Sequence, residues 1–452
     1  MSGSARKAAL TCLLAVVEED AYANLAMAQI VRSAGLSTRD AAFATELAYG
    51  SLRMSGFYDE VISRASGRDA WSLEAVVRAV LWIGAHQSLS MNTPPHAAVS
   101  ETMALAKEAG AERASGLVNA VMRRITERTP EAWVALVAPG NSRESLAIRT
   151  SHPDWIVGEL DRTLSARGRS GELEALLESH NAPASVTLAA RPGIIDRDAL
   201  ASATGGTATS LSPYGVTLAG GSPGAIDAVK DGRAGVQDEG SQLVAAALAS
   251  PAARVASVGE RWLDACAGPG GKTAILGGLA DQCGARVDAL ELHPHRASLV
   301  KDNVRALPLG VVDVHVGDAT TWQGGPYDRI LVDAPCTGLG ALRRRPEARW
   351  RRSPEDLTDL TVLQASILAH AATLLAPGGV IAYVTCSPVL AETRDIVAVS
   401  GLHQLDARAA FAEVTGTSTD DWGQGPDVQL WTHVHGTDSM YLALLTRAEE
   451  GA

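Results

Sequence analysis

The sequence has few cysteines, and their spacing does not suggest a zinc site. Five are present (Cys12, Cys266, Cys283, Cys336 and Cys386), with no CxxC pair and no Cys/His cluster among them. We therefore expect no bound metal. An odd number of widely spaced cysteines is typical of a reducing compartment, so we expect a cytoplasmic protein without disulfides.

The chain also lacks a membrane-spanning run and an excess of positive charge. Arg6 and Lys7 precede the short apolar stretch 8–17, but acidic residues follow directly at 18–20, which favours an amphipathic helix over a signal peptide. No apolar run is long enough to cross a bilayer. The net charge of −12 argues against a generally basic nucleic-acid binder and leaves room for a local basic groove.

What is present indicates three domains in 452 residues. Residues 1–135 carry apolar residues at helical spacing, for example Val76, Val77, Val80 and Leu81, and predict an all-helical domain. Prolines and a glycine at 130–140 mark a boundary. Residues 141–235 predict a small α/β connector, and residues 236–447 predict a sheet domain.

The last domain alternates apolar strands with helices. Strands are expected at 262–265, 287–291, 311–316, 327–332, 380–384 and 440–445. This alternation predicts a mostly parallel, doubly wound sheet whose ligands bind at the carboxyl ends of the strands.

A glycine-rich turn connects the first of these strands to a helix, and it consists of Cys266, Ala267, Gly268, Pro269, Gly270, Gly271 and Lys272. Such a turn lets a ligand approach the backbone, and the helix N-terminus attracts an anion, so a nucleotide-like cofactor is predicted. Glu291, at the end of the next strand, is suited to ribose hydroxyls. Asp318, after the third strand, is suited to the amino group of an adenine.

Two cysteines follow the fourth and fifth strands. Cys336 stands three residues after Asp333, and Cys386 follows Thr385 directly. A thiolate is a strong nucleophile, and both thiols are expected beside one pocket. Simple packing or a disulfide is the alternative for such a pair.

A dense basic run occupies residues 343–352. Its position next to the pocket predicts that arginines hold RNA phosphates there and that an aromatic ring stacks on a base, whereas the alternative is a solvated charged face. The predicted RNA contacts are Arg343, Arg344, Arg345, Arg349, Trp350 and Arg351.

Four motifs in this order resemble the RNA cytosine-5 methyltransferases, and within them the RsmB (Sun/Fmu) type, which acts on 16S ribosomal RNA. They are QDE at 237–239, DACAGPGGKT at 264–273, VDAPCTGLG at 332–340 and VTCSP at 384–388. The N-terminal helices resemble NusB, an RNA-binding factor. The resemblance implies a Rossmann-like, S-adenosylmethionine-dependent methyltransferase domain, preceded by an all-α NusB-like bundle and the α/β connector. Departures are Glu291, where aspartate is frequent, and Ser439, where glycine is usual.

The resemblance also implies roles for single residues. S-adenosylmethionine would be bound by residues 266–272, Glu291, Asp318 and Asp333. Cys386 would attack carbon 6 of the cytosine, Asp333 would stabilise the protonated ring nitrogen 3, and Cys336 would assist release. The residues alone leave open which thiol attacks, because related DNA enzymes use the cysteine of the Pro-Cys motif. They also leave open whether Cys336 or a water removes the carbon-5 proton. We expect a monomer whose partner is RNA.

Two other functions fit parts of the sequence. Gly270 to Thr273 ends like the phosphate loop of an NTPase, and Ile330 to Asp333 is similar to its second motif, but Cys266 stands where the first glycine belongs. A non-catalytic RNA-binding or ribosome assembly factor would keep the fold without turnover. The intact Cys336 and Cys386 argue against it.

Overall fold

The computed structural model describes residues 2–448 and divides the chain into two compact units. The first contains the residues up to Pro183 together with Leu342–Arg351, and the second contains Ala184–Ala341 and the residues from Arg352 onward. This division differs from the three predicted domains. The predicted connector 141–235 is split, because its residues up to Pro183 belong to the first unit and the rest, which contain its strands, belong to the second.

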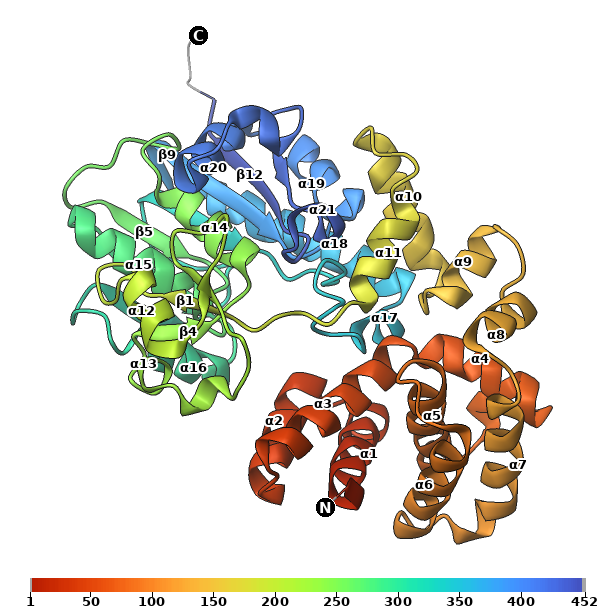
Figure 1. Cartoon of the computed structure of the whole chain (residues 1–452). Helices are drawn as coiled ribbons and strands as arrows, with labels where there is room; N and C mark the ends of the chain where they lie inside the picture. The colour runs from red at the N-terminus through yellow and green to blue at the C-terminus, as the bar shows by residue number, and fades with distance from the viewer. Residues whose placement is uncertain (1, 449–452) are drawn as a thin grey trace. The chain divides into compact units, whose positions relative to one another are not determined.

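The first unit is helical, as expected. In Figure 1 the short helix α17, cyan because it comes late in the sequence, lies beside α4 and α11 of this unit. The helices are α1 Ser2–Glu18, α2 Ala23–Ala34, α3 Thr38–Arg53, α4 Ser55–Ser66, α5 Ala75–Leu89, α6 Pro95–Glu108, α7 Ser115–Thr126, α8 Pro130–Val137, α9 Arg143–Arg149, α10 Asp154–Ala166, α11 Leu173–Asn181 and α17 Ala348–Arg351.

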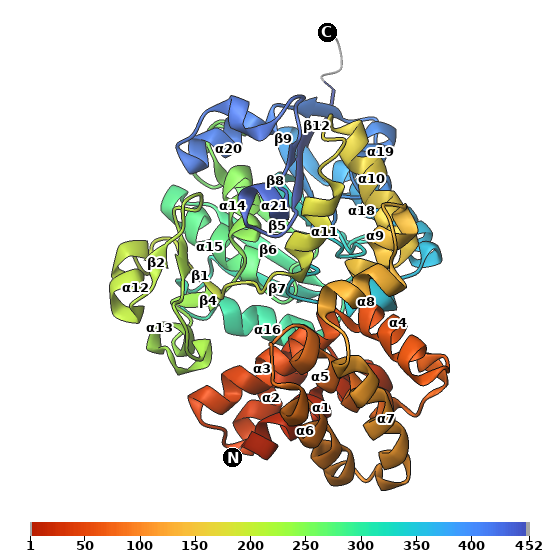
Figure 2. The same cartoon turned by 45° about the vertical axis from the view of Figure 1, so that its right-hand side comes forward.

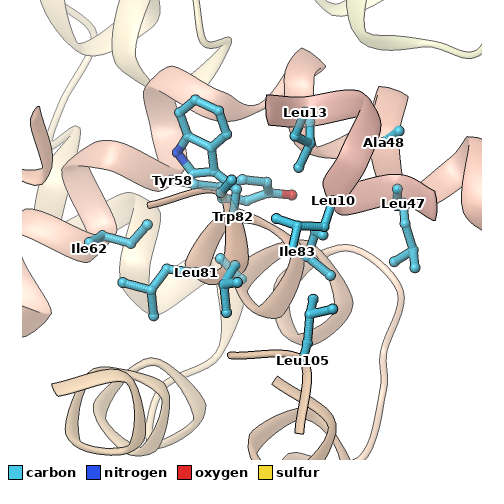
Figure 3. Close-up of a cluster of buried hydrophobic side chains, with 14 of the residues drawn as sticks. Leu10, Leu13, Leu47, Ala48, Tyr58, Ile62, Leu81, Trp82, Ile83 and Leu105 are labelled. Atoms are coloured by element: carbon cyan, nitrogen blue, oxygen red, sulfur yellow. The ribbon is translucent and has the colours of Figure 1, made fainter. Parts of the chain in front are cut away.

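The core of this unit is formed by buried apolar residues from each of the helices α1 to α8. Leu13, Leu47, Ile62 and Leu81 are fully buried and point into the shared interior (Figure 3). Helix α5 is buried over most of its length, and Pro95 begins α6 at a position where a missing N–H costs nothing. The apolar stripes read from the sequence are therefore core positions.

The second unit begins with a small antiparallel sheet of order β2-β3-β1-β4. Its strands are β1 Thr187–Ala190, β2 Thr207–Ala208, β3 Gly215–Thr217 and β4 Ala234–Val236. Leu188, Leu200 and Val216 form its buried core. Helices α12 Arg197–Thr204 and α13 Asp227–Lys230 connect the strands.

The main sheet has eight strands in the order β10-β12-β9-β8-β5-β6-β7, with β11 paired to β12. Strands β9, β8, β5, β6 and β7 are parallel and lie in a row (Figure 2), whereas β10, β11 and β12 pair in antiparallel fashion. The strands are β5 Arg261–Asp264, β6 Arg286–Glu291, β7 Val312–Val316, β8 Tyr327–Asp333, β9 Leu375–Thr385, β10 His403–Leu405, β11 Val428–Gln429 and β12 Tyr441–Thr446.

Helices cover both faces of this sheet because its strands are apolar on both sides. Trp262 belongs to a buried cluster that includes residues of α14, α15 and α20, while its neighbour Leu263 belongs to a second cluster that includes residues of α18 and α19. The predicted doubly wound sheet is thus confirmed. No helix in residues 2–448 combines the length and apolarity that crossing a membrane requires. The helices are α14 Glu239–Ala249, α15 Gly271–Cys283, α16 Pro294–Val304, α18 Pro354–Thr373, α19 Arg394–Val399, α20 Ala407–Thr415 and α21 Thr432–His435.

Candidate active site

The glycine-rich turn runs from the end of β5 to the start of α15, and two of its glycines are sterically required. A Cβ on Gly268 would lie 2.1 Å from Oε2 of Glu291, and one on Gly270 would lie 2.8 Å from the Cα of Val300. Gly270 also has a φ of +112°, a left-handed conformation that favours glycine. Because Gly270 is the N-cap and has no side chain, the first N–H groups of α15 are not capped by one.

The predicted ribose acid, Glu291, is buried directly behind this turn. Its carboxylate accepts hydrogen bonds from the main-chain N–H groups of Gly268, at 3.1 Å, and His293, at 3.0 Å. Arg296, which sequence reasoning missed, lies 3.7 Å from the same carboxylate and donates to the carbonyl of Gly268 at 2.7 Å. Glu291 therefore fixes the turn and stands at its edge.

Asp318 is exposed after β7. Its carboxylate accepts hydrogen bonds from the main-chain N–H of Thr320, at 2.8 Å, and from the hydroxyl of that residue, at 2.7 Å. These two bonds hold the pKa of Asp318 below its usual value, so the side chain is an ionised acceptor. Its contact with an adenine stays a prediction.

Asp264, the last residue of β5, is another acid at this edge, and the sequence analysis did not single it out. It is fully buried and accepts the hydroxyl hydrogen bond of Thr273 at 2.7 Å. Burial raises the pKa of Asp264 to about 7. Its place at the end of a strand, the same signal that identified Glu291, is the feature that would have revealed it.

Lys272 and Asp333 form an ion pair with 2.8 Å between Nζ and Oδ2, and both side chains are largely buried. Burial lowers the pKa of Lys272, but the charge and hydrogen bond of Asp333 and the charge of Cys386 more than offset this, so the pKa rises overall. The ammonium group is therefore charged and interacts electrostatically with the sulfur of Cys386.

The two thiols meet at the carboxyl ends of adjacent parallel strands, β8 and β9. The Sγ atoms of Cys336 and Cys386 lie 3.3 Å apart. The hydrogen bond to Cys386, burial, and the negative charges of Cys386 and Glu392 raise the pKa of Cys336 well above its ordinary value. The raised pKa favours the protonated form of Cys336. Either thiol can donate across this contact, and a hydrogen bond donated by Cys336 would favour negative charge on Cys386.

Cys266, the third cysteine at this edge, has a different environment. Burial and the negative charges of Asp264 and Asp333 raise the pKa of Cys266 well above its ordinary value. A thiol held in its neutral form is a poor nucleophile. Cys266 is therefore suited to contribute backbone to the turn rather than sulfur chemistry.

Gly340 joins the two cysteine segments to the loop before β12. Its N–H donates to the carbonyl of Cys386 at 2.8 Å, and its carbonyl accepts from the N–H of Ser439 at 2.9 Å. A Cβ at Gly340 would lie 2.2 Å from the carbonyl oxygen of Ser439, so only glycine allows this approach. The serine that replaces the usual glycine is accommodated, since its hydroxyl lies 3.1 Å from the N–H of Thr432.

The basic run is not one exposed surface. Residues 342–351 belong to the helical unit, and Arg349 is fully buried there. Its Nη1 donates to the carbonyls of Arg53 (3.0 Å) and Ser151 (2.9 Å) and to the amide oxygen of Asn181 (2.9 Å). These oxygens lie at the C-terminal ends of α3, α9 and α11, where carbonyls lack helical partners and the dipole favours a cation. The prediction that Arg349 contacts RNA is wrong because its guanidinium caps helices.

Other members of the run are also used in folding. Arg351 donates to the carbonyls of Val16 and Ala21 and pairs with Asp20. The ring of Trp350 packs against Gly56, where a Cβ would lie 2.3 Å from the indole. Arg343 and Arg344 are half-buried, and Arg345 is exposed with its guanidinium 5.7 Å from the ring centre of Tyr22. RNA contact by these five residues stays a prediction.

Two families match the chain. The family described as 16S rRNA methyltransferase RsmB/F matches residues 255–446, and the NusB family matches residues 3–127. A Mycobacterium tuberculosis (strain H37Rv) protein whose name places it among the methyltransferases is 48% identical over 98% of this chain and 96% of its own. The ribosomal RNA small subunit methyltransferase B of Pseudomonas putida (strain KT2440) is 32% identical over 87% of each chain.

The chain belongs to the RsmB/F family of methyltransferases. It is an enzyme that uses S-adenosylmethionine, with a NusB-like helical region and a Rossmann-like sheet domain. Solved structures share the fold. The crystal structure of PH0851 has a TM-score of 0.79 at 20% identity and covers 99% of both chains. NSun6 from Pyrococcus horikoshii with SFG has a TM-score of 0.53 at 16% identity and covers 65% of this chain and 98% of its own.

The residues at the sheet edge fit S-adenosylmethionine. The uncapped N-terminus of α15 suits a carboxylate, and the carboxylate of Glu291 suits a ribose diol. An NTPase is not supported, because the hydroxyl of Thr273 is bound to Asp264 and Lys272 is paired with Asp333. In a phosphate loop those groups would serve magnesium and the phosphates.

Proposed function

We propose that this enzyme methylates carbon 5 of a cytosine in RNA, specifically 16S rRNA, through a transient covalent bond between Cys386 and the base. One observation carries the proposal: two thiols 3.3 Å apart stand beside a buried Lys272–Asp333 pair. The name of the P. putida relative, which specifies ribosomal RNA of the small subunit, supports the choice of substrate.

The first step needs a thiolate at Cys386. The S–H of Cys336 and the ammonium group of Lys272 both favour negative charge on that sulfur. Carbon 5 of cytosine is a poor nucleophile, so the Cys386 sulfur bonds to carbon 6 and moves the electrons of the 5,6 double bond toward carbon 5. Asp333 holds the proton at ring nitrogen 3, where the reaction needs it, and Lys272 orients Asp333.

The second half of the reaction restores the base. S-adenosylmethionine, when bound, supplies the methyl group that carbon 5 takes. Once the Cys386 sulfur is bonded to carbon, its negative charge no longer raises the pKa of Cys336. Burial and the charge of Glu392 still raise this pKa. The proton of carbon 5 therefore passes either to a water or to Cys336 after the Cys336 proton has left for solvent. The electrons of that C–H bond re-form the double bond and expel the Cys386 sulfur.

Two cysteine variants test this order of events. C386A should abolish methyl transfer while cofactor binding survives, and C336A should accumulate an RNA–protein adduct that migrates slowly on a denaturing gel. C283A is the matched control, because Cys283 lies at the far end of α15, where its thiol donates to the carbonyl of Ala280. Full activity in C386A would refute the nucleophile assignment. Absence of an adduct in C336A would refute the release role.

The substrate has its own test. Bisulfite sequencing of rRNA from cells with and without this enzyme should show one cytosine in 16S rRNA that loses protection. For the RNA contacts, R345A should weaken rRNA binding and lower the slope of log affinity against log salt by roughly 0.7–0.9. An unchanged slope would show that Arg345 does not contact a phosphate.

A further inference from the structure

A buried carboxylate, that of Glu392, lies close enough to the Cys336 thiol for its charge to raise the pKa of that thiol. Glu392 ends the short helical turn Leu390–Glu392, six residues after Cys386, and is fully buried. Burying a carboxylate is costly unless hydrogen bonds satisfy it. The hydrogen-bond partners of the Glu392 carboxylate therefore indicate its role.

The partners of Glu392 belong to the segment around Cys336. Oε1 accepts the main-chain N–H of Thr337 at 2.7 Å, and Oε2 accepts the hydroxyl of the same residue at 2.5 Å. Oε1 also accepts Nε2 of Gln364 at 3.1 Å, and that amide group donates to the carbonyl of Pro335 at 2.8 Å. The residues before and after Cys336 are thus both fixed, one directly and one through Gln364.

The same network reaches the Cys386 segment. The hydroxyls of Thr337 and Ser387, the residues that follow the two cysteines, lie 3.1 Å apart. The hydroxyl of Tyr383, on β9 before Cys386, donates to the carbonyl of Glu392 at 2.8 Å. One acid therefore connects the segments on which both thiols stand.

We propose that Glu392 is the positioning residue of this active site: its carboxylate holds the Cys336 and Cys386 segments in register, so that the two sulfur atoms stay 3.3 Å apart. The catalytic consequence rests on the proposed function, because the reaction uses both thiols on one base. A displacement of about 1 Å is sufficient to cost roughly 100-fold in rate. Glu392 itself does not touch substrate or cofactor in this scheme.

The distance between the thiols can be tested without RNA and without cofactor. Phenylarsine oxide bridges two neighbouring thiols: two S–As bonds form, the two thiol protons leave with the oxide oxygen as water, and no atom changes oxidation state. Binding to the full-length protein should be tight, and C336A should reduce it to the background of single thiols. We expect E392A to bind the arsenical at least tenfold more weakly than the parent protein.

The choice of substituent separates geometry from charge. In E392Q the amide oxygen can accept from Thr337 and Gln364, and the amide nitrogen can donate to the Thr337 hydroxyl, so affinity for the arsenical should stay within threefold of the parent. E413Q is the control, because Glu413 likewise accepts one N–H, from Ala252 at 2.8 Å, and one hydroxyl, from Ser250 at 2.9 Å. E413Q should bind the arsenical with the same affinity as the parent protein. Arsenical affinity of E392A within twofold of the parent would overturn the proposal.

Steady-state kinetics of methyl transfer then measure the catalytic effect of losing the Glu392 carboxylate. E392A should lower kcat roughly 100-fold while the KM for S-adenosylmethionine stays constant, and E392Q should restore most of the rate. If E392A does not fold, T337V removes only the hydroxyl that links Glu392 to Ser387. It should weaken arsenical binding at least threefold, and parent-like binding would count against the proposal. Methyl transfer by C386A would refute the proposed reaction, but it would not change the comparison of arsenical binding between E392A and the parent protein. Failure of the proposed function and failure of the positioning role are therefore distinguishable.

Discussion

Replacing Arg349 should destabilise the helical unit without any change at the sheet edge. Its guanidinium is fully buried, and Nη1 shares two N–H groups among the oxygens of Arg53, Ser151 and Asn181 at 2.9–3.0 Å. Burial and the charge of Arg53 lower the pKa of Arg349 to about 9, so the group still carries its proton at neutral pH. R349A removes the cation and leaves these oxygens buried without it.

The size of the effect follows from these bonds. A hydrogen bond from a charged donor contributes about 1.5–3 kcal/mol, and breaking a buried charged contact from one side costs about 3–5 kcal/mol in total. We therefore expect R349A to lower the free energy of unfolding of this unit by about 4 kcal/mol. For a unit of this size that corresponds to a Tm lower by roughly 8–16 °C. The Tm of R349K should lie between those of the parent protein and R349A, because one ammonium group does not reproduce the planar guanidinium.

Differential scanning calorimetry of the full-length protein measures this shift, and hydrogen exchange locates it. Exchange should accelerate in the last turns of α3, α9 and α11. The matched control is R143A, which removes an exposed arginine paired with Asp154, and an exposed pair of this kind contributes little to stability. A Tm for R349A within 2 °C of the parent, with unchanged exchange in these helices, would refute the capping role.

Three further outcomes are expected. His152 is buried, and burial and the charge of Arg349 hold its pKa well below 6.5, so unfolding takes up a proton below that pH. Urea unfolding should therefore show stability falling as pH drops from 6.5, by at most about 1.4 kcal/mol per pH unit from this group, and H152Q should flatten the difference. G340A should lower methyl transfer at least tenfold because its Cβ would meet the Ser439 carbonyl at 2.2 Å, whereas G116A, with nothing within 4 Å, should leave activity unchanged. E291Q should weaken S-adenosylmethionine binding about tenfold in calorimetric titration, since an amide is a poorer acceptor for ribose hydroxyls; equal affinity would exclude that contact.

The sheet and its ligand edge could be predicted because their signals are local. Each parallel strand is a short apolar run followed by glycine or a polar residue, and parallel strands bring their carboxyl ends together. That rule was enough to place Glu291, Asp333, Cys336 and Cys386 at one edge. The short antiparallel strands β10 and β11 were missed because two or three residues carry no readable period.

The rest depended on contacts between residues far apart in the sequence. Arg349 stands in a run of arginines that is typical of a solvated or RNA-binding face, and only the carbonyls of residues such as Arg53 and Ser151 reveal its structural role. The contact-based division at Pro183, rather than near the expected boundary at 141, has the same origin. Glu392 gave no signal, because its partners are 28 and 55 residues away.

Because Leu342–Arg351 completes the helical unit, that unit is not a continuous piece of chain. About 160 residues must be synthesised between Pro183 and this segment, which takes roughly 10–30 s at ordinary rates of translation. During that interval the C-terminal ends of α3, α9 and α11 lack the guanidinium of Arg349, which has not yet been synthesised. A gene fragment that stops at residue 183 would lack this guanidinium altogether. Producing the helical unit on its own therefore requires joining the residues up to Pro183 to the segment Leu342–Arg351.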